Sequence, residues 1–243
     1  MGQTKRTLDC EEKIEVLNYL FAEDDLFYLF RIYKDKRRKE ENKRKIIYEY
    51  IFSGLPYEHL IHEMKRRIES DANEICNLVK KFLQKPLNVD TTNKLDLDAF
   101  DSVSCFNYDP VKGTGVYQDL YGKRGVYIFV MDDDYPVPSD FGEAIKCAPL
   151  RRNVTTFHKG EILYIGKTQS MLTRMHEHFS SDNERRGTGS IKLGSVHRSG
   201  LKEKVLVYAF QINKTYRQLY EMIGGTIEDK LHDNFKDYLL GNK

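Results

Sequence analysis

The sequence lacks the usual features of secreted and membrane proteins. Its four cysteines lie far apart with no CxxC pair, so neither a zinc site nor a disulfide framework is indicated. No stretch approaches the roughly 20 consecutive apolar residues of a membrane span, and the first residues contain no apolar leader segment. We therefore expect a reducing, cytoplasmic environment and no association with a membrane.

The chain also lacks a strong net charge, but this average hides two unlike regions. The formal net charge is +2 over 243 residues. Residues 91–144 carry four basic and ten acidic residues, whereas residues 145–206 carry 12 basic and five acidic ones. A basic block of this size is typical of a surface that binds phosphate, although solvated basic loops have the same composition.

The first part of the chain, residues 1–90, has helical periodicity. Apolar residues from Ile14 onward recur at spacings of three and four, and two of the expected helices cover about 57–69 and 71–84. We interpret this part as an all-helical region that grips DNA, forms a dimer, or both. Its most basic stretch, residues 34–45, holds eight Lys and Arg residues. That stretch fits either a solvated helix face or a contact with DNA phosphates.

Residues 91–121 have few periodic apolar residues and many Asp, Asn, Gly and Thr, which predicts an irregular linker. Beyond them, runs of β-branched and aromatic residues predict three strands, at 125–130, 162–165 and 205–212. Helical spacing follows at 171–179 and about 215–240, although Gly224-Gly225 is expected to break or kink the last helix. We therefore expect an α+β fold, in which residues 122–243 form a small mixed or antiparallel sheet flanked by helices.

Motif residues lie at fixed spacings on the first two predicted strands and after the second one. Gly125-Val-Tyr127 lies on the first strand and Tyr164-Ile-Gly166 on the second, directly before Lys167. Arg174 follows Lys167 by seven residues, His178 follows Arg174 by four, and a late glutamate, Glu228, lies on the last predicted helix. The ordered set resembles the GIY-YIG nuclease superfamily over about residues 122–243. Six residues carry this resemblance: Tyr127, Tyr164, Lys167, Arg174, His178 and Glu228.

The resemblance implies that the chain hydrolyses phosphodiester bonds in double-stranded DNA and that these six residues form its catalytic site. Glu228 is expected to hold one Mg²⁺ or Mn²⁺ per site, with Glu221 as the alternative ligand. Arg174 presents a planar, permanently charged fork that suits phosphate oxygens. The family is thought to use a motif tyrosine as general base; we favour Tyr164 and keep Tyr127 as phosphate positioner or alternative base.

The lysine and the histidine are expected to support this base. A tyrosine has a reference pKa of about 10, so cationic neighbours such as Lys167, Arg174 and the metal must lower it. His178 lies one helical turn after Arg174, so that both face the same cleft. It can relay a proton or orient the tyrosine and the attacking water.

Two long insertions distinguish the chain from the usual family pattern. Residues 131–161 separate the two motif strands, and a basic segment, 180–204, precedes the third strand. Basic residues expected to contact the DNA backbone or its grooves are Arg151, Arg152, Arg185, Arg186, Lys192 and Arg198, with Lys36, Arg37 and Arg38 from the first region. Histidine stands at position 178, where repair-type members carry tyrosine.

Together, the insertions and this histidine resemble the type II restriction endonuclease branch. One active site per chain then favours a homodimer on two-fold symmetric DNA, since such a site presents two equivalent strands. Other interpretations remain open: a homing or mobile-element nuclease, a repair-type nuclease, or a catalytically silent DNA-binding protein with the same fold.

Overall fold

The computed structural model describes residues 57–138, 154–179, 191, 193–194, 199–216 and 219–235. The helices expected before residue 57, with the basic stretch 34–45, lie outside the described residues. So do all the basic residues predicted to contact DNA, namely Arg151, Arg152, Arg185, Arg186, Lys192, Arg198, Lys36, Arg37 and Arg38.

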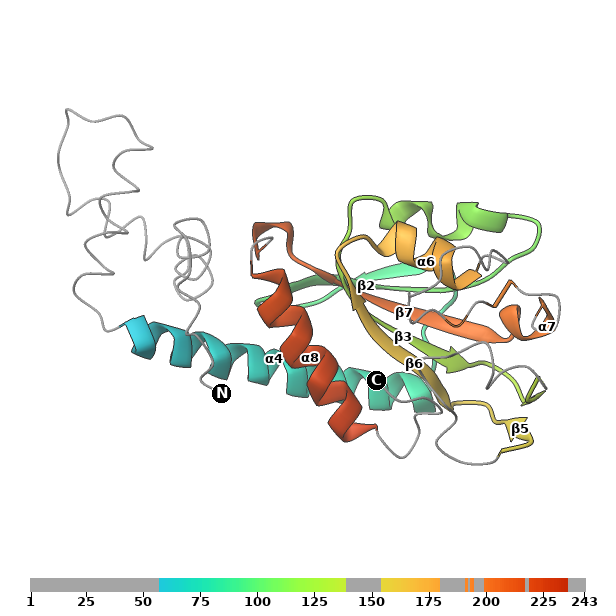
Figure 1. Cartoon of the computed structure of the whole chain (residues 1–243), viewed down its shortest axis with the longest axis horizontal. Coiled ribbons are helices and arrows are strands. Elements are labelled where there is room, and N and C mark those ends of the chain that lie inside the picture. Colours follow the sequence, from blue (N-terminus) through green and yellow to red (C-terminus); the bar gives the residue numbers. More distant parts are fainter. Residues whose placement is uncertain are drawn as a thin grey trace, which may run out of the picture.

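A five-stranded antiparallel sheet forms the centre of the fold (Figure 1). Its spatial order is β1 (Thr91–Lys94), β2 (Phe100–Asn107), β7 (Val205–Ile212), β3 (Gly125–Met131) and β6 (Ile162–Thr168). The central strands β3 and β7 are buried along their whole length, as their β-branched and aromatic composition predicts. The three strands expected from the sequence are therefore present.

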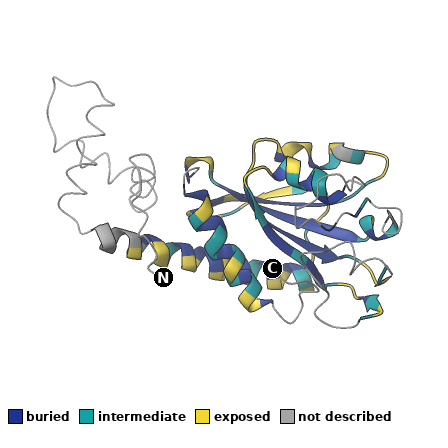
Figure 2. Ribbon diagram, in the orientation of Figure 1, coloured by how far each residue is buried: buried dark blue, intermediate teal, exposed yellow. Residues whose placement is uncertain are grey.

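Helices cover both faces of the sheet. On one face, α4 (Tyr57–Gln84) and α8 (Tyr220–Asn234) lie side by side, and their apolar residues share a core with Val126, Ile128 and Phe210. On the other face, α6 (Met171–Phe179) and the 3₁₀ helix η1 (Gly113–Leu120) enclose a second core with Tyr127 and Phe129. The strands β2, β7 and β3 are mostly buried, whereas the edge strand β1 is largely exposed (Figure 2). The α+β fold is thus confirmed.

The prediction of an irregular linker over residues 91–121 was wrong, because β1, β2 and η1 lie there. The strand β2 has small polar residues where an apolar run would have indicated a strand. Ser104, only 7% exposed, is bonded to Thr92 Oγ1 at 2.9 Å and accepts a hydrogen bond from Gln211 Nε2 at 2.7 Å. Pairing with β7 and these buried hydrogen bonds stabilise the strand, and neither leaves a periodic pattern in the sequence.

Residues 57–84 form one helix of 28 residues, not the two that were expected. The helix continues through Asp71, whose buried carboxylate accepts a hydrogen bond from the backbone N–H of Ala99 at 2.9 Å. Since α4 packs in the same core as the sheet, this last part of the 1–90 region belongs structurally with residues 122–243.

Four short elements complete the described chain. The strands β4 (Tyr135–Pro136) and β5 (Thr156–Phe157) pair within the 131–161 insertion, and α7 (Ser199–Lys202) precedes β7. The 3₁₀ helix η3 (Lys214–Tyr216) follows β7. Within the described residues, no helix combines the length and the apolar character that crossing a membrane requires.

Buried phenols predict how stability responds to alkaline pH. Burial raises the pKa of Tyr117 and Tyr216 to about 12, and raises that of Tyr208 further. These folded-state pKa values lie above the unfolded value of about 10. Above pH 10 the phenols therefore ionise in the unfolded protein before they do so in the folded one, and this favours unfolding. We expect the free energy of unfolding to fall above pH 10, by up to ~1.4 kcal/mol per pH unit for each such phenol.

Urea unfolding between pH 7 and pH 11 measures this effect. In Tyr208→Phe the free energy of unfolding should fall less steeply above pH 10 than in the parent protein. Tyr121→Phe, at a residue that is 78% exposed, should leave this decrease unchanged. A pH profile that is the same for both variants and the parent protein would show that ionisation of Tyr208 does not couple to unfolding.

Candidate functional site

Four of the predicted site residues meet on the α6 face of the sheet. The rings of Tyr127 on β3 and Tyr164 on β6 are stacked, with centroids 5.9 Å apart. From α6, Arg174 donates from Nε to Tyr127 Oη at 2.9 Å and from Nη2 to Tyr164 Oη at 3.3 Å. His178 Nε2 lies 2.9 Å from Tyr127 Oη. We call Tyr127, Tyr164, Arg174 and His178 the Tyr-Arg-His cluster.

The register of two strands and the pitch of one helix bring the cluster together. In the β3–β6 pair, Tyr127 lies opposite Gly166 and Phe129 lies opposite Tyr164. Alternate residues of a strand share a face, so both tyrosines point toward α6. Arg174 and His178 are four residues apart on α6 and so lie one turn apart on one side of the helix.

Gly166 leaves the space that the two phenol rings occupy. A Cβ atom at this position would lie 2.6 Å from Tyr127 Oη and 2.7 Å from Tyr164 Cε1. Gly166→Ala should therefore displace the rings and destabilise the fold by about 1–3 kcal/mol, as overpacking in a core does. Gly115→Ala is the matched control, since a Cβ there meets nothing within 4 Å. Equal unfolding free energies for the two variants would contradict this packing.

The two tyrosines differ in burial. Tyr127 is completely buried, and burial raises its pKa well above 10, with a further rise from Tyr164 that Arg174 opposes. It therefore stays protonated at neutral pH and serves as a hydrogen-bonding framework. Tyr164 is only half-buried, so it is the phenol of the cluster that is accessible from the surface.

A glutamate that the sequence analysis did not identify holds the guanidinium. Arg174 Nη1 lies 2.7 Å from Glu177 Oε2, and the two side chains are only 15% and 16% exposed. Contacts within the described residues thus use three of the five guanidinium N–H groups. The i, i+3 spacing of the two residues on one helix was the signal that could have revealed this pair.

Lys167 lies on the opposite face of β6, toward α8. Its Nζ is 3.0 Å from Glu221 Oε2, and Gln169 Nε2 donates to Glu221 Oε1 at 3.1 Å. Contrary to expectation, α8 continues through Gly224-Gly225 without a break. The two glycines make room for the lysine, because a Cβ at Gly225 would lie 3.3 Å from its Nζ.

The position of Glu221 bears on the choice between the two candidate metal ligands. Glu228 lies seven residues later on α8 and is half-buried, and its charge contributes, after burial and Glu221, to the raised pKa of Tyr220. The hydrogen bonds from Lys167 and Gln169 go to Glu221. The Lys167–Glu221 pair therefore lies on the α8 face of the edge strand β6, whereas the Tyr-Arg-His cluster lies on its α6 face. Of the two glutamates, Glu221 is thus the one that pairs with the motif residue Lys167.

A single carboxylate fits one kind of metal site. Within the ranges that the structure describes, no three His, Cys, Asp or Glu side chains are grouped so as to hold a metal ion. The Glu221 side chain is 58% exposed. Mg²⁺ is often bound through one or two carboxylates, with waters and substrate phosphates as its other ligands. The donor set at Glu221 is consistent with that mode of binding.

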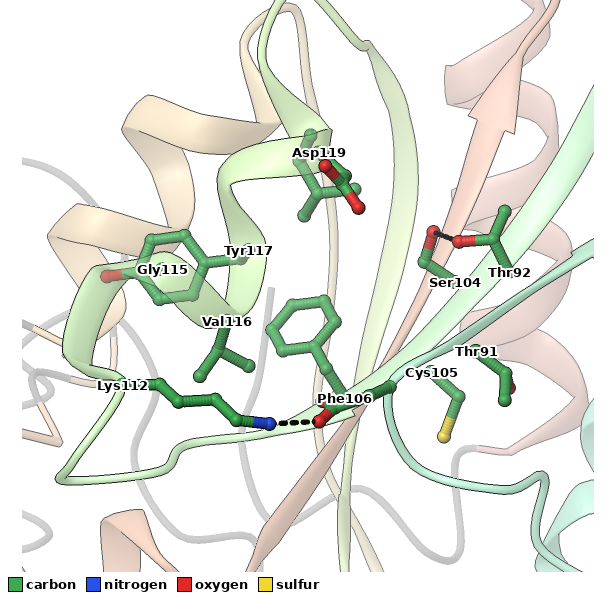
Figure 3. Close-up of a pocket in the computed structure, with 12 residues that line it drawn as sticks. Thr91, Thr92, Ser104, Cys105, Phe106, Lys112, Gly115, Val116, Tyr117 and Asp119 are labelled. Carbon is green, nitrogen blue, oxygen red and sulfur yellow. Dashed lines mark hydrogen bonds and ion pairs between the residues drawn. The ribbon is translucent and has the colours of Figure 1, made fainter.

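A separate pocket of about 200 Å³ lies between η1 and the strands β1 and β2 (Figure 3). Its lining includes the hydroxyls of Thr92 and Ser104, the ring of Phe106 and the ammonium of Lys112. None of the predicted site residues lines it. Its volume is below the 300–1,000 Å³ that is usual for small-molecule sites, so the Tyr-Arg-His cluster remains the stronger candidate.

The cluster and the Lys167–Glu221 pair combine three chemical capacities: a surface-accessible phenol, a guanidinium that can bind an oxyanion, and a carboxylate. Comparisons of the chain with protein-family models, with curated proteins and with solved structures found no match. The similarity to the GIY-YIG superfamily therefore remains a prediction, which depends on the motif residues and their spacing.

Proposed function

We propose that this protein is a metal-dependent endonuclease that hydrolyses phosphodiester bonds in double-stranded DNA at specific sites, as restriction enzymes do. The observation that carries the proposal is the contact of one guanidinium, that of Arg174, with both motif tyrosines. A fold alone does not require these polar groups to converge. Phosphodiester hydrolysis does need an anion clamp next to a base that can activate water.

Tyr164 is the proposed general base. Its side chain is half-buried, and its oxygen accepts a hydrogen bond from Arg174 Nη2 at 3.3 Å. In this role the phenolate removes a proton from the water that attacks phosphorus. Tyr127 stays protonated and holds the guanidinium in place.

Arg174 is the proposed phosphate clamp. Its Nε and one N–H on each terminal nitrogen are used by the tyrosines and Glu177, and the other two N–H groups can bind non-bridging oxygens. Negative charge on these oxygens is stabilised by a fork that is already oriented, which lowers the activation barrier.

For the metal ligand we propose Glu221 in place of Glu228. A Mg²⁺ or Mn²⁺ ion held by Glu221 would supply positive charge that stabilises the negative charge developing on the phosphate during hydrolysis. Lys167 orients the Glu221 carboxylate through their ion pair and keeps a second cation at this edge of the sheet. One such site in each chain is consistent with a homodimer acting on two-fold symmetric DNA.

Cleavage of supercoiled plasmid by the full chain with Mg²⁺ tests this proposal. We expect nicked and linear products, and Tyr164→Phe should reduce the rate about 100-fold or more because the base is lost. Tyr121→Phe removes an exposed hydroxyl outside the site and should leave the rate unchanged. A folded protein that binds DNA and leaves it intact would instead favour the alternative of a catalytically silent DNA-binding protein.

A further inference from the structure

His178 is completely buried, and both of its ring nitrogens have assigned neighbours within the described residues. The backbone N–H of Ile191 donates to His178 Nδ1 at 3.1 Å. On the other side of the ring, Nε2 lies 2.9 Å from Tyr127 Oη. The two neighbours are not equivalent, since a backbone N–H can only donate whereas a phenol can donate or accept.

The Ile191 amide thereby decides where the imidazole carries its hydrogen. A nitrogen that accepts a hydrogen bond from an N–H group has its lone pair in that bond and carries no hydrogen itself. The neutral ring of His178 must then be protonated at Nε2, and this N–H donates to Tyr127 Oη.

This donation makes the phenol oxygen of Tyr127 an acceptor. Tyr127 Oη also accepts from Arg174 Nε at 2.9 Å, so that two donors point at one phenol oxygen. The ring of Tyr164 is stacked on that of Tyr127, with centroids 5.9 Å apart. The same guanidinium donates from Nη2 to Tyr164 Oη at 3.3 Å, so Arg174 links the two phenol oxygens.

The backbone N–H of Ile191, where this series of hydrogen bonds begins, lies in a buried segment. Ile191 is 1% exposed and Leu193 is fully buried, and both belong to the core under α6. A second bond ties the same segment to the same histidine, because the N–H of Leu193 donates to the His178 backbone oxygen at 2.7 Å. The amide therefore cannot turn away without disrupting buried packing.

We infer that the backbone amide of Ile191 is a positioning group for the site. It holds His178 as the neutral Nε2–H tautomer, so the hydrogen bonds run in one direction, from Ile191 through His178 to the oxygen of Tyr127, which also accepts from the guanidinium that contacts Tyr164. His178 orients the tyrosines and does not shuttle protons. The structural part of this inference stands without the proposed function, whereas its effect on catalysis rests on it.

Nitrogen-15 NMR of the histidine-labelled full chain tests the tautomer directly. The chain has seven histidines, so the His178 signals are assigned by their loss in His178→Gln. We expect Nδ1 to give the signal of a bare ring nitrogen and Nε2 that of a protonated one. A ring protonated at Nδ1, a doubly protonated ring, or rapid averaging between tautomers would overturn the inference.

Two variants at one position separate the hydrogen bond from the packing. Ile191→Ala keeps the N–H and shortens the buried side chain, so the tautomer should persist. Ile191→Pro removes the N–H, so the single tautomer should be lost and kcat should fall about tenfold, with KM for DNA changed less than about twofold. Retention of the single tautomer in a folded Ile191→Pro protein would contradict the inference. If Ile191→Pro does not fold, the inference is tested by the tautomer of His178 in the parent protein and in Ile191→Ala, which must be protonated at Nε2 in both.

The same experiments distinguish this inference from the proposed function. If the parent protein cuts no DNA but shows the expected tautomer, the proposed function fails and the positioning by Ile191 stands. If it cuts DNA with His178 in the other tautomer, the positioning fails and the nuclease proposal stands.

Discussion

Arg174→Gln is expected to reduce DNA cleavage about 100- to 1,000-fold while changing DNA affinity less than about threefold. The guanidinium acts on charge that develops during the reaction, so its loss raises the activation barrier far more than it weakens ground-state binding. The whole chain has 39 Lys and Arg residues including Arg174, so many others remain to hold the DNA backbone. Single-turnover cleavage and gel-shift titrations on the same DNA measure the two quantities.

Lys112→Gln is the matched control for Arg174→Gln, because it also removes one positive charge. Lys112 is 54% exposed, lies beside η1 and pairs with Asp90, away from the Tyr-Arg-His cluster. It should cleave DNA at the parental rate. If binding and cleavage by Arg174→Gln fall by the same factor, Arg174 is only a contact for the DNA backbone and the proposed clamp is wrong.

Glu221→Gln should abolish metal-dependent cleavage, with a loss of about 100-fold or more, and should leave DNA binding intact. The substitution keeps the shape of the side chain and removes the charge that would hold the cation. Without metal, affinity for DNA is expected to rise slightly, since a carboxylate next to phosphates is repulsive. Cleavage and gel shifts, each with Mg²⁺ and with a chelator, measure these effects.

Glu228→Gln is the matched control, because it removes the same charge from the same helix two turns away. We expect its cleavage rate to stay within about threefold of the parental rate. The opposite pattern, with Glu228→Gln inactive and Glu221→Gln active, would restore Glu228 as the metal ligand. Undiminished cleavage in chelator would remove the metal from the mechanism.

The elements that were predicted from the sequence are those with a clear local pattern, either an apolar run or a helical period. The strands β3 and β7 are almost continuous apolar and aromatic runs, β6 begins with such a run, and α6 shows a clear helical period. By contrast, β2 contains Ser102 and Ser104 and is stabilised by its neighbour β7, which no local pattern indicates. The continuous α4 likewise depends on packing and on the distant hydrogen bond that Asp71 accepts.

In the Tyr-Arg-His cluster, the spacing of residues along the sequence predicted which side chains share a helix face and which lie on neighbouring strands. Arg174 and His178 share a helix face by their separation of four residues, and the motif tyrosines lie on neighbouring strands. The choice between Glu221 and Glu228 could not be made, because both lie on the same side of α8 and only the docking of that helix against Lys167 separates them. The amide of Ile191 leaves no sequence signal, since every residue except proline has one.

Sequencing the ends of cleaved DNA tests the central claim most directly. A mixture of long DNA fragments is incubated with the full chain and Mg²⁺, and in parallel with chelator and with the Arg174→Gln variant. The proposed function predicts ends that accumulate at one short sequence with the parent protein and Mg²⁺, and that are absent in the other two reactions. Intact DNA in all three reactions, ends scattered over unrelated sequences, or ends that persist with Arg174→Gln would contradict it.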